Sequence, residues 1–309
     1  VLLGYIAGGS YKRIEHYAGQ AGLVLLVLVV MVGSVAALGR WVSRHPEEVR
    51  SFGRRQMARP IPARIHRRFH AQLDFLGRRL KPGQVLGLAL TIELIALGLA
   101  AWLFGVVVDD VLSGNGIAQF DRPISTALGE HQVDWLTDVM RGISALGSVP
   151  VLIGLCAVAG LVARRVTSSW TPMLILGAAL AGGIFLSEAV RPLVDRVRPP
   201  LLSGDSVLDS TFPSTRAAQS VAAYGAMAYV AAGWLRNWSR RVAVWTGAVV
   251  LVLLIGFSRL YLGAQWTTDV LGGLGLGAVW LGVVFVTTSA VQGAWQRHRR
   301  PASPVTVAS

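Results

Sequence analysis

Apolar runs long enough to cross a lipid bilayer recur along most of this chain. A membrane-spanning α-helix needs roughly 20 consecutive apolar residues. Runs of this kind occur at about 20–41, 84–108, 146–163, 171–193, 216–235, 242–262 and 266–289. The first run stands apart, and the other six follow one another after a long polar segment. The pattern predicts an all-α, multi-pass integral membrane protein with about seven transmembrane helices, six of them in one bundle.

Composition supports the same class. Of 309 residues, 53% are hydrophobic and 15% are charged, and the mean hydropathy is +0.54, which is too apolar for an ordinary water-soluble domain of this length. The single cysteine, Cys156, lies within an apolar run, which excludes an intrachain disulfide and a cysteine metal site. We expect it to be a small core residue.

Charge is concentrated in the polar segment between Trp41 and Pro82, which holds eleven Arg or Lys residues against three Asp or Glu. Basic loops next to membrane spans remain in the cytoplasm. This segment and the C-terminal tail are therefore predicted to be cytoplasmic in a cell-membrane protein, and the loop 194–215 is predicted to lie outside. That loop breaks the rule, because it carries Arg196 and Arg198.

A net charge of +13 raises the alternative of a nucleic-acid partner. Most of this charge lies next to predicted spans, where it sets topology and attracts anionic lipid headgroups. We therefore predict a lipid bilayer with anionic headgroups, and no nucleic acid, as the partner of the basic segments.

Three polar segments fall at the outer ends of predicted spans. They are RPLVDRVRP with Arg191 and Arg198, FPSTRAA with Ser214, Thr215 and Arg216, and SRLYLGAQWTTDV with Arg259, Gln265 and Asp269. Charged groups at such a depth are costly and mark functional sites. The three segments are therefore predicted to bring polar side chains to one depth of the membrane.

The chemistry available to these side chains is anion binding. Arginine presents a planar fork of donors that matches phosphate oxygens, and Ser214 stands where a helix is predicted to begin, so nearby backbone N–H groups can face an anion. Arg191, Arg198, Ser214 and Arg259 are predicted to form a phosphate cradle, with Thr215 and Arg216 beside them. No metal or cofactor is predicted, because the loop carboxylates Asp195 and Asp205 lack a histidine or a third carboxylate at useful spacing.

The patterns R-x6-RP, PS-x-R and SR-x5-Q-x3-D, in this order, resemble the signature of the type 2 phosphatidic acid phosphatases, within the lipid phosphatase and vanadium haloperoxidase superfamily. That signature reads K-x6-RP, PSGH and SR-x5-H-x3-D, and the resemblance covers roughly residues 84–290. It implies a metal-independent reaction. The third-motif histidine attacks phosphorus, the aspartate four residues later orients it, and the PSGH histidine protonates the leaving alcohol.

Carried over by position, Arg191 stands for the lysine, and Arg198, Ser214, Arg259 and Asp269 match directly. The two residues that do the chemistry differ.

Gln265 occupies the position of the nucleophile, and a carboxamide neither forms a phosphoenzyme nor titrates near neutrality. Arg216 occupies the position of the acid, and a guanidinium with a pKa above about 12 does not give up a proton. We expect Asp269 to hold Arg259 or Gln265 and to be the one acidic group offsetting the arginines.

Three functions remain open from the residues. The first is a module that binds a phosphorylated membrane lipid without hydrolysing it. The second is an active lipid phosphatase whose missing groups come from water, substrate or His131, the one histidine predicted to be both outside and within the six-span unit. The third is a structural or partner-binding membrane domain whose arginines pair with anionic lipid.

The N-terminal segment GYIAGGSYKRIEHYAGQAG resembles the C-terminal end of the DedA membrane proteins, a family associated with lipid transport. The resemblance implies a fragment of a longer fusion, with a polyprenyl lipid such as undecaprenyl phosphate or pyrophosphate as ligand beside phosphatidic acid. The predicted division is 1–41, the tail of a DedA-like domain with one span; 42–82, a basic cytoplasmic linker; 83–291, a six-helix phosphatase-like domain; and 292–309, a basic, disordered tail.

Two further patterns concern packing. Residues 133–149 carry apolar side chains at helical spacing, which predicts a helix that starts at the outer interface and runs into the third span. The glycine-rich run LGGLGLGAVWLG from Leu271 follows no strand, so it favours close helix packing over a nucleotide loop.

Overall fold

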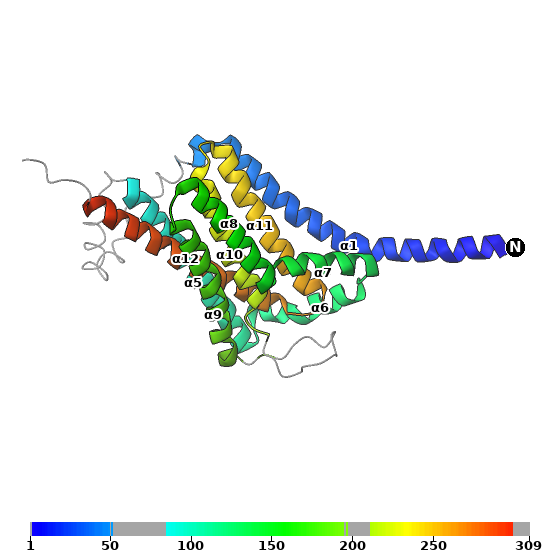
Figure 1. The fold of residues 1–309 in the computed structure, drawn as a ribbon. Coiled ribbons are helices and arrows are strands. Elements are labelled where there is room, and N and C mark those ends of the chain that lie inside the picture. The colour runs from blue at the N-terminus through cyan, green and yellow to red at the C-terminus, as the bar shows by residue number, and fades with distance from the viewer. Residues whose placement is uncertain (1, 50, 52–84, 195, 197–210, 299–309) are drawn as a thin grey trace, which may run out of the picture.

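The computed structural model describes residues 2–49, 51, 85–194, 196 and 211–298, with side chains for all of these except 2–21, 85–92 and 293–298. Helices make up the described structure (Figure 1). They are α1 (Leu2–Arg44), α5 (Val85–Ser113), the 3-10 helix η1 (Gly116–Phe120), α6 (Asp121–Glu130), α7 (Asp134–Leu146), α8 (Val149–Thr167), α9 (Thr171–Val194), α10 (Thr215–Trp234), α11 (Trp238–Tyr261) and α12 (Thr267–His298). The prediction of an all-α membrane protein is confirmed.

Each of the seven predicted spans corresponds to a long helix in the structure. Six described helices are long and apolar enough to cross a membrane, namely α1 from Gly22, α5 from Glu93, α8, α9, α11 and α12. The seventh predicted span, 216–235, forms α10, which is 20 residues long but less apolar than the other six helices.

Helix α10 is less apolar because it lies inside the bundle. It packs against α8, α9, α11 and α12, and buries Ala217, Ala218, Ala222 and Ala223 completely. A helix surrounded by other helices does not need an apolar surface, and alanine lets the neighbours approach closely. The buried position also explains how α10 carries polar residues along its length.

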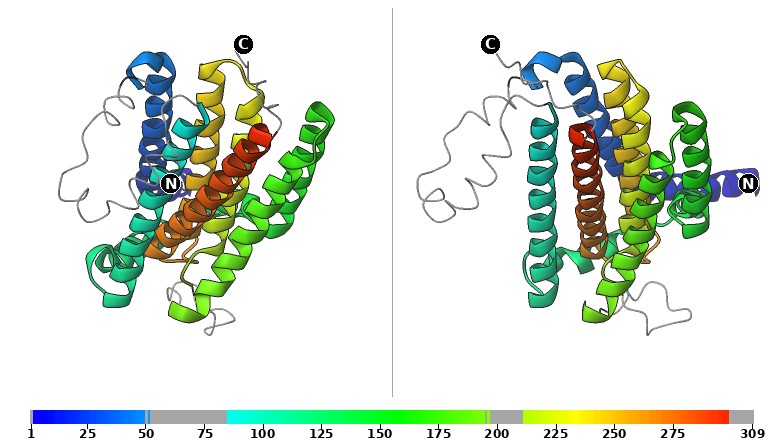
Figure 2. Two further views of the ribbon diagram at one scale, coloured as in Figure 1. Left: turned by 90° about the vertical axis from the view of Figure 1, so that its left-hand side faces the viewer. Right: turned by 60° about the vertical axis from the view of Figure 1, so that its left-hand side comes forward.

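The glycine-rich run in α12 serves this close packing, as predicted. A Cβ atom at Gly273 would collide with the backbone carbonyl of Ser214, and one at Gly277 would collide with that of Ala218. Helix α12 therefore touches the backbone of α10 at its first turn. On its other side α12 packs along α5 (Figure 2).

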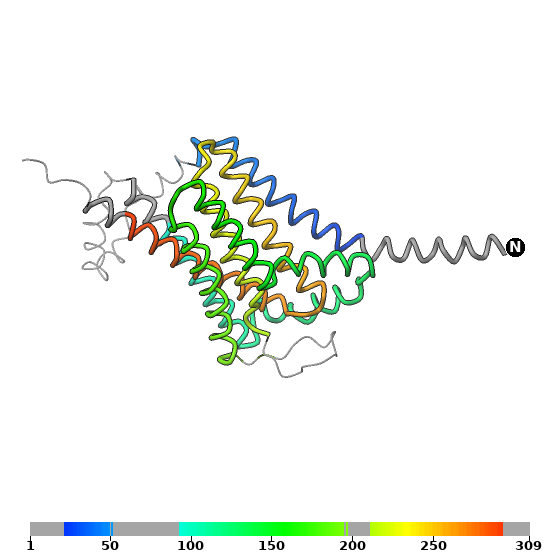
Figure 3. The backbone as a smooth tube through the Cα atoms, viewed as in Figure 1, coloured from blue at the N-terminus to red at the C-terminus, as the bar shows by residue number. Residues whose placement is uncertain are grey.

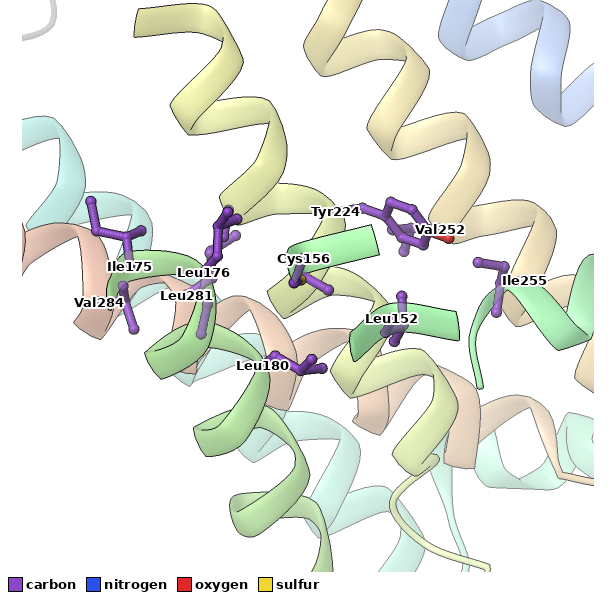
Figure 4. Close-up of a cluster of buried hydrophobic side chains, with 13 residues drawn as sticks. Leu152, Cys156, Ile175, Leu176, Leu180, Tyr224, Val252, Ile255, Leu281 and Val284 are labelled. Atoms are coloured by element: carbon purple, nitrogen blue, oxygen red, sulfur yellow. The ribbon is translucent and has the colours of Figure 1, made fainter. Parts of the chain in front are cut away.

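The main apolar core lies between α8, α9, α10, α11 and α12 (Figure 4). Leu152, Leu176 and Ile255 are fully buried there, and Tyr224 is a further buried member of this core. Cys156 is a free, buried member of this cluster, so the prediction of a small core residue is confirmed.

Helix α7 ends earlier than predicted. The segment 133–149 was expected to run into the third span as one helix, but α7 stops at Leu146, and α8 begins at Val149 after a turn at Gly147. Side chains of α10 hold this turn: Gln219 Nε2 donates to the carbonyl of Gly147 at 2.6 Å, and Tyr224 Oη donates to that of Leu146 at 2.9 Å. Donors from another helix thus satisfy carbonyls that the end of α7 leaves open.

Helix α1 packs along α11, and the part of α1 from Gly22 onward follows α11 closely (Figure 3). Val24 is fully buried in a cluster with Met140 and Tyr261, while Trp238 Nε1 donates to the carbonyl of Val42 at 3.1 Å. Most of the predicted linker 42–82 and of the tail 292–309 lies outside the described residues.

Candidate functional site

Three segments far apart in sequence meet at one end of the bundle, where α9 ends, α10 begins and the chain turns from α11 into α12. We call this the site end. The Ser214 backbone N–H donates to the Asp269 carbonyl at 2.9 Å, and Arg191 Nη2 donates to Thr215 Oγ1 at 2.6 Å. The structure therefore joins the RPLVDRVRP, FPSTRAA and SRLYLGAQWTTDV segments directly.

Ser214 is the first residue of this junction. It is the N-cap of α10, and its Oγ accepts a hydrogen bond from the Ala217 N–H at 3.2 Å. The same hydroxyl donates to Gln265 Oε1 at 2.5 Å, and both side chains are buried. Ser214 thus fixes the start of α10 and the orientation of the Gln265 carboxamide together.

The turn between α11 and α12 places Gln265. Helix α11 ends at Tyr261, and Gly263 has a φ of 64°, in the left-handed region that glycine adopts without a Cβ penalty. The N–H of Ala264 closes the turn on the carbonyl of Arg259 at 3.0 Å. The chain therefore reverses between Arg259 and Gln265 and brings both to the site end.

Asp269 is fully buried but does not hold the residues expected. Its Oδ2 accepts from the backbone N–H of Trp266 at 2.9 Å, and its Oδ1 accepts from Arg196 Nη1 at 2.9 Å. The first contact is a capping interaction at the start of α12. The expected partners, Arg259 and Gln265, are replaced by Arg196 and the helix terminus.

Arg196 is the centre of a network that sequence reasoning missed. Its Nη2 donates to Asp121 Oδ2 at 2.7 Å, and its Nη1 donates to Thr268 Oγ1 at 2.5 Å besides Asp269. Asp121, from α6, also accepts from the backbone N–H and the hydroxyl of Thr268. One guanidinium therefore ties α6 and α12 to the chain that follows α9, and it pairs with two buried carboxylates.

Arg191 has an acidic neighbour that was also not foreseen. Glu188, one turn earlier on α9, lies 3.2 Å from Arg191 Nη1, and Thr215 Oγ1 donates to its other carboxylate oxygen at 3.4 Å. The expectation that Asp269 alone offsets the arginines is therefore wrong. Glu188 lies beside Arg191, and Arg196 pairs with both Asp121 and Asp269.

Arg216 and Arg259 converge on Ser144, at the end of α7. Arg216 Nη1 donates to the Ser144 hydroxyl at 2.8 Å and to its carbonyl at 3.1 Å, while Arg259 Nη1 donates to the same hydroxyl at 3.4 Å. Two like charges at one hydroxyl repel each other, and a bound anion would relieve that repulsion. Ser144 had no motif around it, and its role depends on the turn after α7.

Two other predicted site residues, Arg198 and His131, have no described contact with this junction. Arg198 lies outside the described residues. His131 follows α6, and its Nδ1 lies 2.6 Å from the carbonyl of Ala127 on that helix. Its ring contact is local, so nothing in the described part of the chain links it to Gln265. Among the described residues, there is also no group of three His, Cys, Asp or Glu side chains arranged to hold a metal ion.

The chain has clear relatives. A family model described as the PAP2 superfamily matches residues 172–292, which include all three segments of the junction. Phosphatidylglycerophosphatase B of Bacillus subtilis (strain 168) is 31% identical over 180 residues, covering 57% of this chain and 87% of that protein.

A crystal structure of a transmembrane PAP2 type phosphatidylglycerolphosphate phosphatase from Bacillus subtilis has the same fold. It superposes with a TM-score of 0.57 and 26% identity, over 67% of this chain and 98% of that one. Sequence motifs, helical architecture and relatives agree, and the chain therefore belongs to the PAP2 superfamily.

Proposed function

We propose that this PAP2 domain binds the phosphate headgroup of a membrane lipid at the site end and does not hydrolyse it. The observation that carries the proposal is the buried hydrogen bond between Ser214 and Gln265. The position of the nucleophile is filled by a carboxamide that is already held by the serine of the second motif. Such a group is a hydrogen-bonding ligand and not a nucleophile.

The binding half of the proposal rests on the donors around this pair. Arg191 from α9, Arg216 from α10 and Arg259 from α11 reach the junction, and guanidinium groups bind phosphate oxygens in pairs. The first turn of α10 adds the positive end of a helix. Arg198 is proposed as a further ligand on the basis of its motif position.

The loss of hydrolysis rests on what the two altered positions do. Arg216 binds Ser144, so it serves as a structural donor where the family pattern has an acid. Asp269, which orients the nucleophile in the family pattern, forms an ion pair with Arg196 here. A nucleophile and an acid each contribute several orders of magnitude in rate, so little turnover should remain without both.

The second candidate function is an active phosphatase. It is favoured by the 31% identity to a protein named as a phosphatase, and it requires a nucleophile other than Gln265. Water, the substrate or His131 would have to supply it. In the third candidate, a structural membrane domain, the arginines pair with anionic lipid of any kind.

The proposed ligands are a polyprenyl phosphate or pyrophosphate, such as undecaprenyl phosphate, and phosphatidic acid. The proposed orientation places the site end outside the cell membrane, with the basic segment 42–82 and the C-terminus in the cytoplasm, because basic loops stay inside. A DedA-like upstream domain, proposed from the first 41 residues, would deliver a lipid of this class.

Phosphate release decides between the first two functions. The purified chain in detergent is given phosphatidylglycerophosphate, phosphatidic acid or undecaprenyl pyrophosphate, beside the variants Gln265→His and Gln265→His/Arg216→His. We expect no release by the parent and measurable release by the double variant. Turnover by the parent above a no-protein blank would refute the loss of hydrolysis.

Binding is tested separately, because a silent parent also fits the structural domain. Retention of short-chain phosphatidic acid is compared for the parent, Arg259→Gln and Arg141→Gln. Arg141 is exposed and pairs with Asp138 on α7, so it controls for the loss of one positive charge. We expect Arg259→Gln to weaken retention about tenfold, the loss of one charge-assisted pair, and Arg141→Gln to leave it unchanged. Equal retention by all three would favour the structural domain.

A further inference from the structure

A cavity of about 990 Å³ lies at the other end of the bundle from Gln265. We call this end, where α8, α10 and α12 finish and α11 starts, the far end. The cavity is bounded by α1, the α8–α9 turn, the end of α10 and the first turns of α11. None of the residues of the junction at the site end lines this cavity.

The walls of the cavity belong to membrane-spanning segments. Leu38 and Val42 come from the span of α1, Ile175 from that of α9, and Val249 from that of α11. Their side chains are apolar, and they belong to segments long and apolar enough to cross a membrane. An apolar chain is therefore the kind of group that fits the interior.

The rim of the cavity has a different character. Trp234, Trp238 and Trp245 line it, and tryptophan is enriched where a membrane meets water. Arg241 also lines it, with its Nε donating to the carbonyl of Leu235 at 2.6 Å, and no carboxylate among the described residues pairs with it. The rim therefore combines interfacial aromatic groups with one cation.

The far end around this rim is basic. The described residues there include Arg40, Arg44, Arg164, Arg165, Arg236, Arg240 and Arg241, against Glu47 and Glu48. Each basic residue near a membrane surface attracts anionic lipid. The charge of the far end therefore selects an anionic headgroup over a zwitterionic one.

We propose that this cavity binds one anionic glycerophospholipid, with an acyl chain in the space between α1 and the helices α9 and α10 and with the headgroup phosphate at Arg241. The ligand differs in role and place from the lipid proposed for the site end, and neither proposal depends on the other. A lipid in this position would fill the gap that α1 leaves against α9 and α10, and so fasten α1 to the bundle.

The test uses native mass spectrometry of the full chain released from detergent. Dioleoyl phosphatidylglycerol and dioleoyl phosphatidylcholine are added in turn, and all proteins carry Arg259→Gln so that headgroup binding at the site end is weakened. We expect this parent to retain one phosphatidylglycerol more strongly than phosphatidylcholine. Equal retention of the two lipids would overturn the proposal.

Two variants with matched controls locate the bound lipid. Arg241→Gln should weaken retention of phosphatidylglycerol about fivefold, the effect of one surface arginine, while Arg240→Gln, beside it but not lining the cavity, should not. Gly233→Leu adds a side chain at the cavity wall, where a Cβ meets open space, and should abolish retention.

Gly247→Leu is the control for the cavity-filling change, since it adds the same side chain to α11 in open space away from the cavity. Equal retention by the Gly233 and Gly247 variants would overturn the proposal. A dimer in the parent that Gly233→Leu removes would also overturn it, because a second copy of the chain would then occupy the cavity.

Discussion

At the scale of single residues, the contact between Ser214 and Gln265 determines what the site can do. The Ser214 hydroxyl has one proton, and it is given to Gln265 Oε1. The N–H of Ala217 uses the serine as acceptor. Ser214 is thus committed to two protein partners, and in the proposed function position 265 controls how the site end binds a phosphate.

We predict that Gln265→Glu weakens phosphate binding while the protein stays folded. The serine hydroxyl can still donate to a carboxylate at this position, so the local geometry is kept. A negative charge beside the ligand oxygens, however, opposes an anion by like-charge repulsion. Retention of short-chain phosphatidic acid should fall at least about tenfold, which corresponds to a loss of about 1.4 kcal/mol in binding free energy.

Gln119→Glu is the matched control for this prediction. Gln119 is exposed on η1, which packs against α6 and α12, so its variant adds the same charge on the surface. It should bind as the parent does. Equal binding by Gln265→Glu and Gln119→Glu would mean that the ligand lies elsewhere.

The residue scale is also where sequence reasoning was least complete. The motifs pointed to Arg191, Ser214, Gln265 and Asp269, and the structure brings these segments together. Motifs gave no sign of Ser144, because its role comes from a turn that α10 holds in place. Long-range partners of this kind have no signature in local spacing.

At the scale of helices, Arg196 acts as a clamp between elements. It connects α6, through Asp121, to the first turn of α12, through Thr268 and Asp269. Asp121 and Asp269 are almost fully buried, and the Arg196 side chain is 20% exposed. Breaking a buried ion pair from one side leaves uncompensated charge and is more costly than losing a surface pair.

We predict that Arg196→Gln lowers the free energy of unfolding by about 3 kcal/mol, the cost of removing one partner of a buried pair. Arg141→Gln should cost less than about 1 kcal/mol, because the pair between Arg141 and Asp138 is exposed on both sides. Thermal melting of the three proteins in the same detergent checks this. Equal melting temperatures of the two variants would show that the clamp does not stabilise the fold.

The clamp also shows why elements were predicted better than their connections. Hydrophobic runs located every long helix, since crossing a membrane imposes a length and an apolar composition, but α1 begins and α12 ends well beyond the predicted runs. They did not show that α10 is buried among helices, or that Asp121 would meet α12. Arg196 was noted as a basic residue on the unexpected side of the membrane, and its two carboxylate partners explain how that charge is accommodated.

At the scale of the whole molecule, α1 follows α11 from the site end to the far end. Val24 is buried with Tyr261, near the site end, and Val42 accepts the Trp238 hydrogen bond at the opposite end. The predicted domain boundary at residue 41 therefore falls within α1, a helix packed against the phosphatase-like bundle. Sequence composition alone treats a span as a separate unit, because it does not show which helix faces which.

The Trp238 hydrogen bond gives a last prediction, about how the far end holds α1. The indole N–H satisfies one of the carbonyls at the end of α1, which have no partner within the helix. Trp238→Phe removes the donor and keeps an aromatic ring, so docking of residues 35–44 should weaken by about 1 kcal/mol. Hydrogen–deuterium exchange should rise in these residues and stay unchanged at Ser214.

Trp245→Phe is the control, because Trp245 lines the same cavity and donates no hydrogen bond among the described residues. If both variants exchange alike, the volume of the indole and not its hydrogen bond holds α1 in place.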